Sequence, residues 1–179
     1  MSDQTQNDLQ MALSGVRADI DRIDGELLRL LNERARCAQK VGEIKAEHGE
    51  AGHIYRPERE AQVLRRLQEA NPGPLPGENI TFFFREVMSA CLALEEPLGI
   101  AFLGPLGTFS ESAATKHFGH AARLLPQSAI DDVFREVESG HAHYAVVPVE
   151  NSTEGAVGRT MDLLTPLLRT ARPRRPGER

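Results

Sequence analysis

Cysteine is scarce in this chain of 179 residues, and no hydrophobic run is long. The two cysteines, Cys37 and Cys91, both fall in helical patterns, which indicates reduced thiols and not a disulfide framework. Neither has a neighbouring histidine, which argues against a thiol nucleophile. No stretch approaches the ~18 apolar residues of a membrane span, and the polar start MSDQTQND does not resemble a signal peptide. We therefore expect a cytoplasmic protein without a membrane partner.

Basic residues are outnumbered by acidic ones, 21 against 26, and the net charge of −5 argues against a nucleic-acid partner. No spacing of histidines or cysteines is typical of a metal site, and His141 and His143 fit a loop pair better than a pair of ligands. We therefore expect neither a metal nor a cofactor. The hydrophobic content of 40% fits a globular protein with room for one domain or two small ones.

The strongest positive feature is a long amphipathic pattern over residues 9–48. Apolar residues recur there in steps of three and four: Leu13, Val16, Ile20, Ile23, Leu27, Leu30, Cys37, Val41 and Ile44. This spacing predicts one helix with a narrow apolar seam. A helix of about 38 residues would be roughly 57 Å long, which exceeds the width of a 100-residue domain. We therefore expect the seam to pack against a second copy in an intertwined dimer.

One position of the seam is occupied by a cation, Arg34. Removing a guanidinium from water costs several kcal/mol unless an anion meets it. Eleven residues later, Lys45 returns to nearly the same face of the helix. The two side chains are long enough to converge on a small anion. An interhelical salt bridge for Arg34 and a solvated Lys45 are the alternative interpretation.

Three helices are predicted in the first half of the chain and an α/β pattern in the second. A second helix runs from Pro57 to about Ala70, residues 71–77 form a break, and a third helix covers Glu78–Glu96. From residue 98, short apolar strands alternate with helices, which predicts a parallel α/β sheet. Its expected elements are a strand at 98–103, a helix capped by Ser110 that reaches His117, a strand at 123–125, a helix capped by Ser128 that ends near Gly140, a strand at 144–149 and a helix to about Leu164.

These patterns divide the chain into three regions. Residues 1–97 are all-α, residues 98–166 are α/β, and residues 167–179 form an Arg/Pro-rich tail that we expect to be disordered. In the α/β region, the GPLGTFS turn could present backbone N–H groups to an anion at the start of a helix. Such turns are more often purely structural.

Further charged residues of the helical region could join the anion site. Arg17 lies too far along the long helix to reach Arg34 within one chain, but in an antiparallel dimer it could reach the partner's site. Arg59 and Glu60 begin the second helix. Three or four cations around one small cavity would suit a dicarboxylate.

The residues also resemble a known family. The all-helical chorismate mutase domain is similar to the first region through LSGVRADIDRIDGELLRLLNERARCAQKVGEIK, YRPEREAQVLRRL and FREVMSACLALE. The start of prephenate dehydratase is similar to the second region through IAFLGPLGTFSESAATKHFG and VVPVENSTEGAVGRTMDLL. In this order, the two regions resemble the bifunctional P-protein family of phenylalanine biosynthesis.

The resemblance implies a chorismate mutase whose site needs no nucleophile. Chorismate carries two carboxylates, and its Claisen rearrangement to prephenate depends on restraint and on stabilisation of the ether oxygen as its bond to carbon breaks. By similarity, Arg34 and the partner's Arg17 hold the carboxylates, and Lys45 bonds the ether oxygen.

The resemblance assigns five more residues to this site. Glu60 takes the ring hydroxyl, with backbone help near Arg56, and Arg59 adds positive charge. Glu95 meets the ether oxygen from the other side, where Glu serves only when protonated, so activity should fall as pH rises. Cys91 stands where some members have Ser. Glu95 and Cys91 are four residues apart and should share one face of the third helix.

For the second region, the resemblance implies part of a prephenate dehydratase lobe, similar to half of a periplasmic-type binding protein. One wall of a prephenate cleft would be lined by Gly107, Thr108, Ser110, Asn151, Ser152 and Gly155. The family's Thr-Arg-Phe motif does not occur in the chain. We therefore expect a truncated, inactive dehydratase. Two alternatives to the mutase are a non-catalytic helical dimerisation module and a small-anion-binding domain built on the α/β region.

Overall fold

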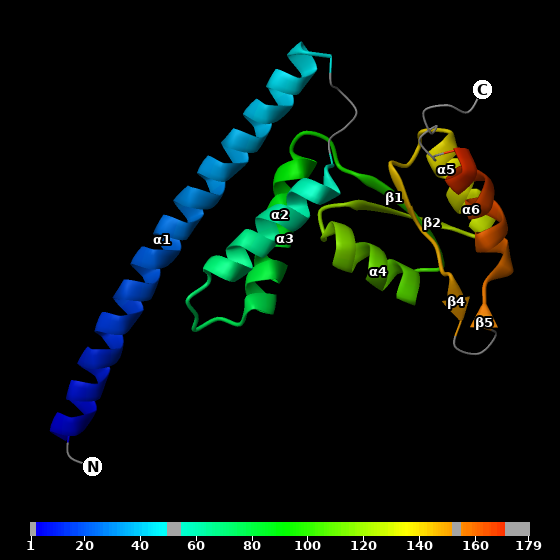
Figure 1. The fold of residues 1–179 in the computed structure, drawn as a ribbon. Helices are drawn as coiled ribbons and strands as arrows, with labels where there is room; N and C mark the ends of the chain where they lie inside the picture. Colours follow the sequence, from blue (N-terminus) through cyan, green and yellow to red (C-terminus); the bar gives the residue numbers. More distant parts are fainter. Residues whose placement is uncertain (1–2, 50–54, 152–154, 171–179) are drawn as a thin grey trace. The chain divides into compact units, whose positions relative to one another are not determined.

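A single helix of 45 residues, α1 (Asp3–Glu47), forms the first part of the computed structural model, which describes residues 3–49, 55–151 and 155–170 (Figure 1). The predicted helix is confirmed, and it begins six residues earlier than expected. Pairs of opposite charge at i and i+4 support it, such as Arg22 with Glu26 at 2.9 Å. Lys45 in the last turn suits the negative end of the helix dipole.

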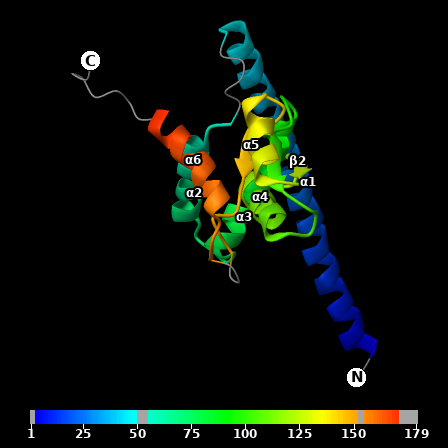
Figure 2. The same cartoon turned by 90° about the vertical axis from the view of Figure 1, so that its right-hand side faces the viewer.

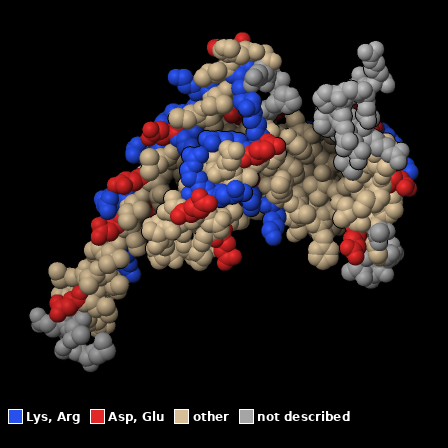
Figure 3. All heavy atoms as spheres, in the orientation of Figure 1, with Lys and Arg blue, Asp and Glu red and all other residues tan. Residues whose placement is uncertain are grey.

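The apolar seam of α1 remains exposed. Its members with large aliphatic side chains are between 40% and 58% exposed: Leu13, Val16, Ile20, Ile23, Leu27, Leu30, Val41 and Ile44. Acidic and basic side chains are interspersed along the rest of the helix (Figure 3). A helix with one apolar and one charged face normally buries the apolar one.

A helical hairpin follows, made of α2 (Pro57–Ala70) and α3 (Gly77–Ala93). Proline at the first position of α2 is compatible with a helix start, as predicted. Asn71 closes the connecting turn by donating from its side chain to the Leu75 carbonyl at 2.7 Å. The third helix ends at Ala93, three residues earlier than predicted, and the chain leaves it through a tight turn.

A three-stranded parallel sheet in the order β2-β1-β3 confirms the predicted α/β architecture. Its strands are β1 (Gly99–Leu103), β2 (Arg123–Gln127) and β3 (Tyr144–Val146), connected by α4 (Phe109–Phe118) and α5 (Ile130–Glu138). The two helices cover opposite faces of the sheet. Since neighbouring strand residues point to opposite sides, each helix contacts a different set of them. Ile100 packs with Phe118 of α4 and Ala101 packs with Val133 of α5.

Three local predictions for this region are wrong. Thr108, and not Ser110, is the N-cap of α4, since its side chain accepts from the Glu111 N–H. Ser128 does not cap α5 either; Ala129 holds that position, and the Ser128 hydroxyl donates to Asp132. The strand β3 has three residues, half of the predicted length.

The last described elements follow β3. They begin with a short antiparallel pair, β4 (Glu150–Asn151) with β5 (Gly155–Ala156). The final helix α6 (Gly158–Thr170) lies beside α5 (Figures 1 and 2). It continues past Leu164, so residues 167–170 are helical and not part of a disordered tail, while residues 171–179 lie outside the described part.

Two compact units result, residues 1–52 and residues 53–179. The larger unit contains the hairpin of α2 and α3 together with the sheet. Leu92 packs against the sheet core. Gly119, which ends α4 with a φ of +79°, lies so close to Ser89 that an added Cβ would be 2.5 Å from it. Within the described ranges, no helix is long and apolar enough to cross a membrane.

Candidate functional site

Arg34 and Lys45 are half-buried on α1, while the apolar side chains of the seam are exposed. Arg22 and Arg29 of the same helix each pair with a glutamate four residues later at 2.9 Å. Arg34 has no such partner within the described part of α1. A guanidinium held partly out of water without a carboxylate leaves its charge available to an anion. Arg17 is exposed, roughly 26 Å along the helix from Arg34.

The start of α2 carries three of the predicted site residues. Arg56 holds the N-cap position with an extended backbone, and its carbonyl accepts from the Glu60 N–H at 3.1 Å. Arg59 is exposed. The Glu60 side chain is only 16% exposed, and its Oε1 lies 3.4 Å from Nε of Arg85 on α3. This ion pair is far less exposed than the pairs along α1.

Arg85 was missed by the sequence analysis. It lies four residues before Ser89 and seven before Leu92, on the face of α3 that the structure turns toward its neighbours. That spacing is present in the sequence, but no local pattern distinguishes Arg85 from an exposed arginine, because its partner Glu60 lies 25 residues away.

Tyr55, just before α2, was also missed. Its hydroxyl lies 3.4 Å from Nε2 of His117, and its ring packs against Phe118 and Tyr144 with centroids 5.5 and 5.4 Å away. Burial raises the pKa of Tyr55 to about 12, and the charge and a hydrogen bond of Glu60 act in the same direction. The phenol therefore keeps its proton at neutral pH and can donate a hydrogen bond.

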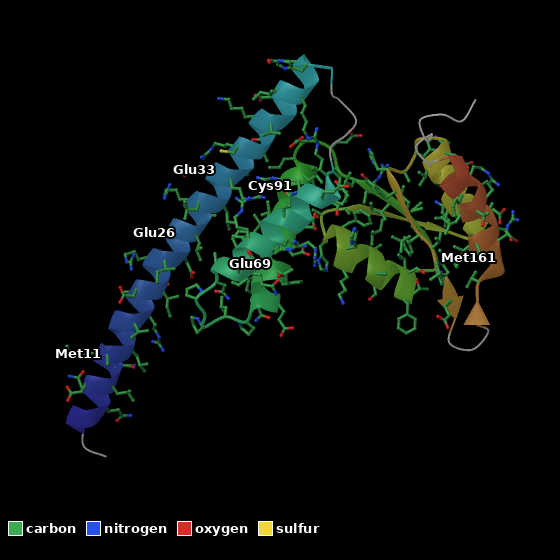
Figure 4. The ribbon with its side chains drawn as sticks, viewed as in Figure 1. Met11, Glu26, Glu33, Glu69, Cys91 and Met161 are labelled. Carbon is green, nitrogen blue, oxygen red and sulfur yellow. The ribbon has the colours of Figure 1, made fainter. Side chains whose placement is uncertain are left out.

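Cys91 lies within α3, and Glu95 lies two residues beyond its end. Cys91 lies on α3 and is 5% exposed (Figure 4). Glu95 is half-buried in the turn that follows the helix, where its N–H donates to the Leu92 carbonyl at 3.0 Å.

The GPLGTFS turn is occupied by the chain's own carboxylate. The Glu111 side chain accepts from the Gly107 N–H, while the Glu111 N–H donates to Thr108 Oγ1 at 3.4 Å. This reciprocal arrangement resembles a capping box. The expectation that the turn offers free N–H groups to an anion is therefore wrong for Gly107.

The other predicted dehydratase residues lie on separate elements. Ser110 is half-buried in the first turn of α4, and Asn151 pairs with Gly155 across β4 and β5. Ser152 lies outside the described residues. A cavity of about 770 Å³ includes Gly107 and Thr108, and its opposite side comes from α3, including Arg85. In the described part of the chain, no group of three or more His, Cys, Asp or Glu is arranged to hold a metal ion.

The comparisons with known proteins divide the chain as its fold pattern does. Residues 16–96 match the family model of chorismate mutase type II, and residues 100–170 match that of prephenate dehydratase. The chain therefore combines a helical mutase-type region with an α/β dehydratase-type region.

Individual relatives carry both regions. The bifunctional chorismate mutase/prephenate dehydratase of Neisseria gonorrhoeae is 60% identical over 83% of this chain, and that of Pseudomonas aeruginosa is 53% identical over 90%. The chain is similar to bifunctional chorismate mutase/prephenate dehydratases through both of its matched regions. It spans 40% and 44% of the lengths of these two relatives. The structure of chorismate mutase (form II) from Thermus thermophilus is 42% identical, covers 48% of this chain and 94% of its own, and has a TM-score of 0.45.

Proposed function

We propose that residues 1–97 convert chorismate to prephenate in phenylalanine biosynthesis. The observation that carries this proposal is Arg34, a half-buried cation in an apolar seam without an acidic partner in the described part of α1. A doubly negative substrate would supply the missing charge. The family match over residues 16–96 supports the same assignment.

The chemistry needs electrostatic restraint and no cofactor. Arg34 and the partner's Arg17 would hold the two carboxylates of chorismate in the reactive geometry. Lys45 would stabilise the ether oxygen as the carbon–oxygen bond breaks. We assign Lys45, Arg34 and Glu95 to catalysis.

Residues of the hairpin and of the turn that follows it are assigned to the same substrate. Glu60 would accept the ring hydroxyl, with the Arg56 backbone beside it, and Arg59 would add positive charge. Glu95, protonated, would donate to the ether oxygen opposite Lys45. We also assign Cys91 to substrate binding.

We further propose a homodimer in which a second copy covers the seam of α1. The aliphatic side chains that are exposed in one chain, eight along a single stripe, are too many for a solvated helix face. Ile20→Asp should dissociate this dimer and abolish turnover, because Arg17 then no longer reaches the partner's site. Ala18→Asp adds the same charge about 200° away on the helix and should do neither. Light scattering and activity measured together test both variants.

Residues 98–166 would form the N-terminal part of a prephenate dehydratase domain, as the match over residues 100–170 suggests. We assign Gly107, Thr108, Ser110, Asn151, Ser152 and Gly155 to one wall of its cleft. Residues 1–179 contain no Thr-Arg-Phe sequence, so we expect no phenylpyruvate from this chain by itself. The acidic net charge of −5 also fits a cytoplasmic enzyme without nucleic-acid partners.

Chorismate disappearance and calorimetric binding of a bicyclic transition-state analogue test the mutase assignment on the full chain. Saturable turnover and tight analogue binding are expected. Absence of both would favour a non-catalytic dimerisation module. A chain cut after Pro97 is unsuitable material, because α2 and α3 belong to the same compact unit as the sheet.

A further inference from the structure

The Glu60 carboxylate is held by a donor on another helix. Arg85 Nε on α3 lies 3.4 Å from Glu60 Oε1, and both side chains are largely buried. Glu60 also raises the pKa of the Tyr55 phenol, which indicates that this hydroxyl lies near the same carboxylate. A carboxylate that is 16% exposed needs a partner, because losing water without one costs several kcal/mol. The Arg85 contact also restricts the rotamers that Glu60 can adopt.

Tyr55 is in turn fixed by the α/β part of its unit. Nε2 of His117 lies 3.4 Å from the Tyr55 hydroxyl, and the ring packs against Phe118 of α4 and Tyr144 of β3. The Tyr144 hydroxyl donates to the Tyr55 backbone carbonyl at 3.5 Å. Direct contacts therefore connect the sheet to Tyr55, which lies five residues before Glu60.

We propose that Arg85 and Tyr55 are positioning residues that hold Glu60 for the ring hydroxyl of chorismate, so that the α/β region supports the mutase site. This inference rests on the proposed mutase function. It assigns the α/β region a part in chorismate turnover that is independent of any dehydratase activity. Neither residue is expected to touch the substrate; each acts through Glu60.

A double-mutant cycle tests whether both residues act through Glu60. Arg85→Gln and Tyr55→Phe should each lower kcat/KM by about tenfold, the value of one hydrogen bond to a charged group. In a Glu60→Ala background, neither should lower it further, because the group that they position is gone. Arg66→Gln, on an exposed position of α2, is the control and should leave kcat/KM unchanged in both backgrounds.

Equal losses in the two backgrounds would overturn the proposal, since Arg85 and Tyr55 would then act on stability alone. Restoration of activity by Arg85→Lys, which keeps the charge near Glu60, would support it. If the unaltered chain shows no turnover of chorismate, the proposed function itself fails. If the unaltered chain is active but the losses are equal in the two backgrounds, only the positioning role fails.

The contact itself can be measured without activity. The chain has two tyrosines, so Tyr144→Phe leaves Tyr55 as the only phenol, and its ionisation can be followed by absorbance. The charged and titratable groups that face it are Glu60, Arg85 and His117. Glu60→Gln should lower the pKa of Tyr55, because the carboxylate raises it, and Arg85→Gln should raise it further. An unchanged pKa of Tyr55 in Glu60→Gln would refute the contact on which the proposal depends.

Discussion

Ile23 on α1 and Ile100 on β1 are the same residue in two regions with opposite surroundings. Ile23 is 46% exposed, whereas Ile100 has no exposed surface, because it lies in the middle strand of the sheet and packs under α4. Both positions belong to apolar patterns that are plain in the sequence. Periodicity therefore identifies the side of an element that is apolar, but not what covers it.

The same contrast applies to the charged residues. In the unit of residues 53–179, the largely buried Glu60 already has its counter-ion, Arg85, within the chain. On α1, half-buried Arg34 has none among the described residues of the helix. In the larger unit the counter-ion of Glu60 lies within the chain, whereas for Arg34 we propose that the substrate supplies it.

Among the substitutions that test this contrast, Arg34→Ala is expected to have the largest effect. Arg34→Ala should lower kcat/KM for chorismate by about a thousandfold, the upper range for loss of one preorganised donor. Arg29→Ala on the same helix removes an exposed arginine that pairs with Glu33 and should stay within about twofold. Steady-state kinetics with circular dichroism as the folding check separate the two. Similar losses of kcat/KM in both variants would mean that Arg34 contributes no more to turnover than an exposed arginine of the same helix.

Truncation of the two isoleucines comes next. Ile100→Ala should lower the free energy of unfolding by about 3 kcal/mol, because it leaves a cavity in a closed core, and this loss should not depend on protein concentration. Ile23→Ala removes apolar surface from the proposed contact with a second copy, so its dimer should dissociate at a higher protein concentration than the dimer of the unaltered chain. Urea unfolding measures the first effect, and light scattering at several concentrations measures the second. Equal dissociation of the two chains would contradict the proposed dimer.

The dependence of activity on pH distinguishes the two groups proposed at the ether oxygen. Glu95 belongs to the larger unit and is proposed to act protonated, so activity should decline severalfold as pH rises. Glu95→Gln should flatten that decline, since an amide donates at every pH. Lys45→Gln, on α1, should lower activity at all pH values without changing the slope of the profile. An unchanged profile in Glu95→Gln would remove Glu95 from this role.

The sequence predicted elements best where one local signal sets them. Pro57 defined the start of α2, and the seam defined α1. The N-cap of α4 was not predictable from residue types alone, because Thr108 and Ser110 are both good capping residues. The contacts of Glu111 with Gly107 and Thr108 favour Thr108. The early end of α3 was not visible, because Leu94 and Glu95 both fit a continuing helix.

The candidate site was predictable to the extent that its residues break a local pattern. Arg34 was conspicuous as a cation among aliphatic residues. Arg85 and Tyr55 were not, because their partners lie 25 and 62 residues away, at Glu60 and His117. Such contacts arise from packing between elements, which no local period encodes.

A smaller effect should appear at alkaline pH in the larger unit alone. The pKa of Tyr55 is raised from 10.0 to about 12 in the folded chain. Between these values the unfolded chain loses its proton first, so folding stability falls as pH rises. Tyr55→Phe removes this contribution and should make the decline in urea midpoint from about pH 9 to pH 11 shallower. The helicity of α1, which contains no tyrosine, should not respond to the substitution. An equally steep decline in Tyr55→Phe would contradict the assignment.

The smallest effect concerns ion pairs at the surface of the two regions. Arg159 on α6 donates to Asp131 on α5, which holds the pKa of that carboxyl below its usual value. Its contribution should be present above the ordinary carboxyl pKa and lost as pH falls through the lowered one. Asp131→Asn should therefore be slightly less stable than the unaltered chain near neutral pH and equal to it in strong acid, as urea midpoints can show. Glu33→Gln, which breaks a pair within α1, should have no measurable effect at either pH, because that pair links neighbouring turns of one helix and holds no two elements together. Equal effects of the two substitutions would mean that the ion pair between Arg159 and Asp131 does not stabilise the larger unit.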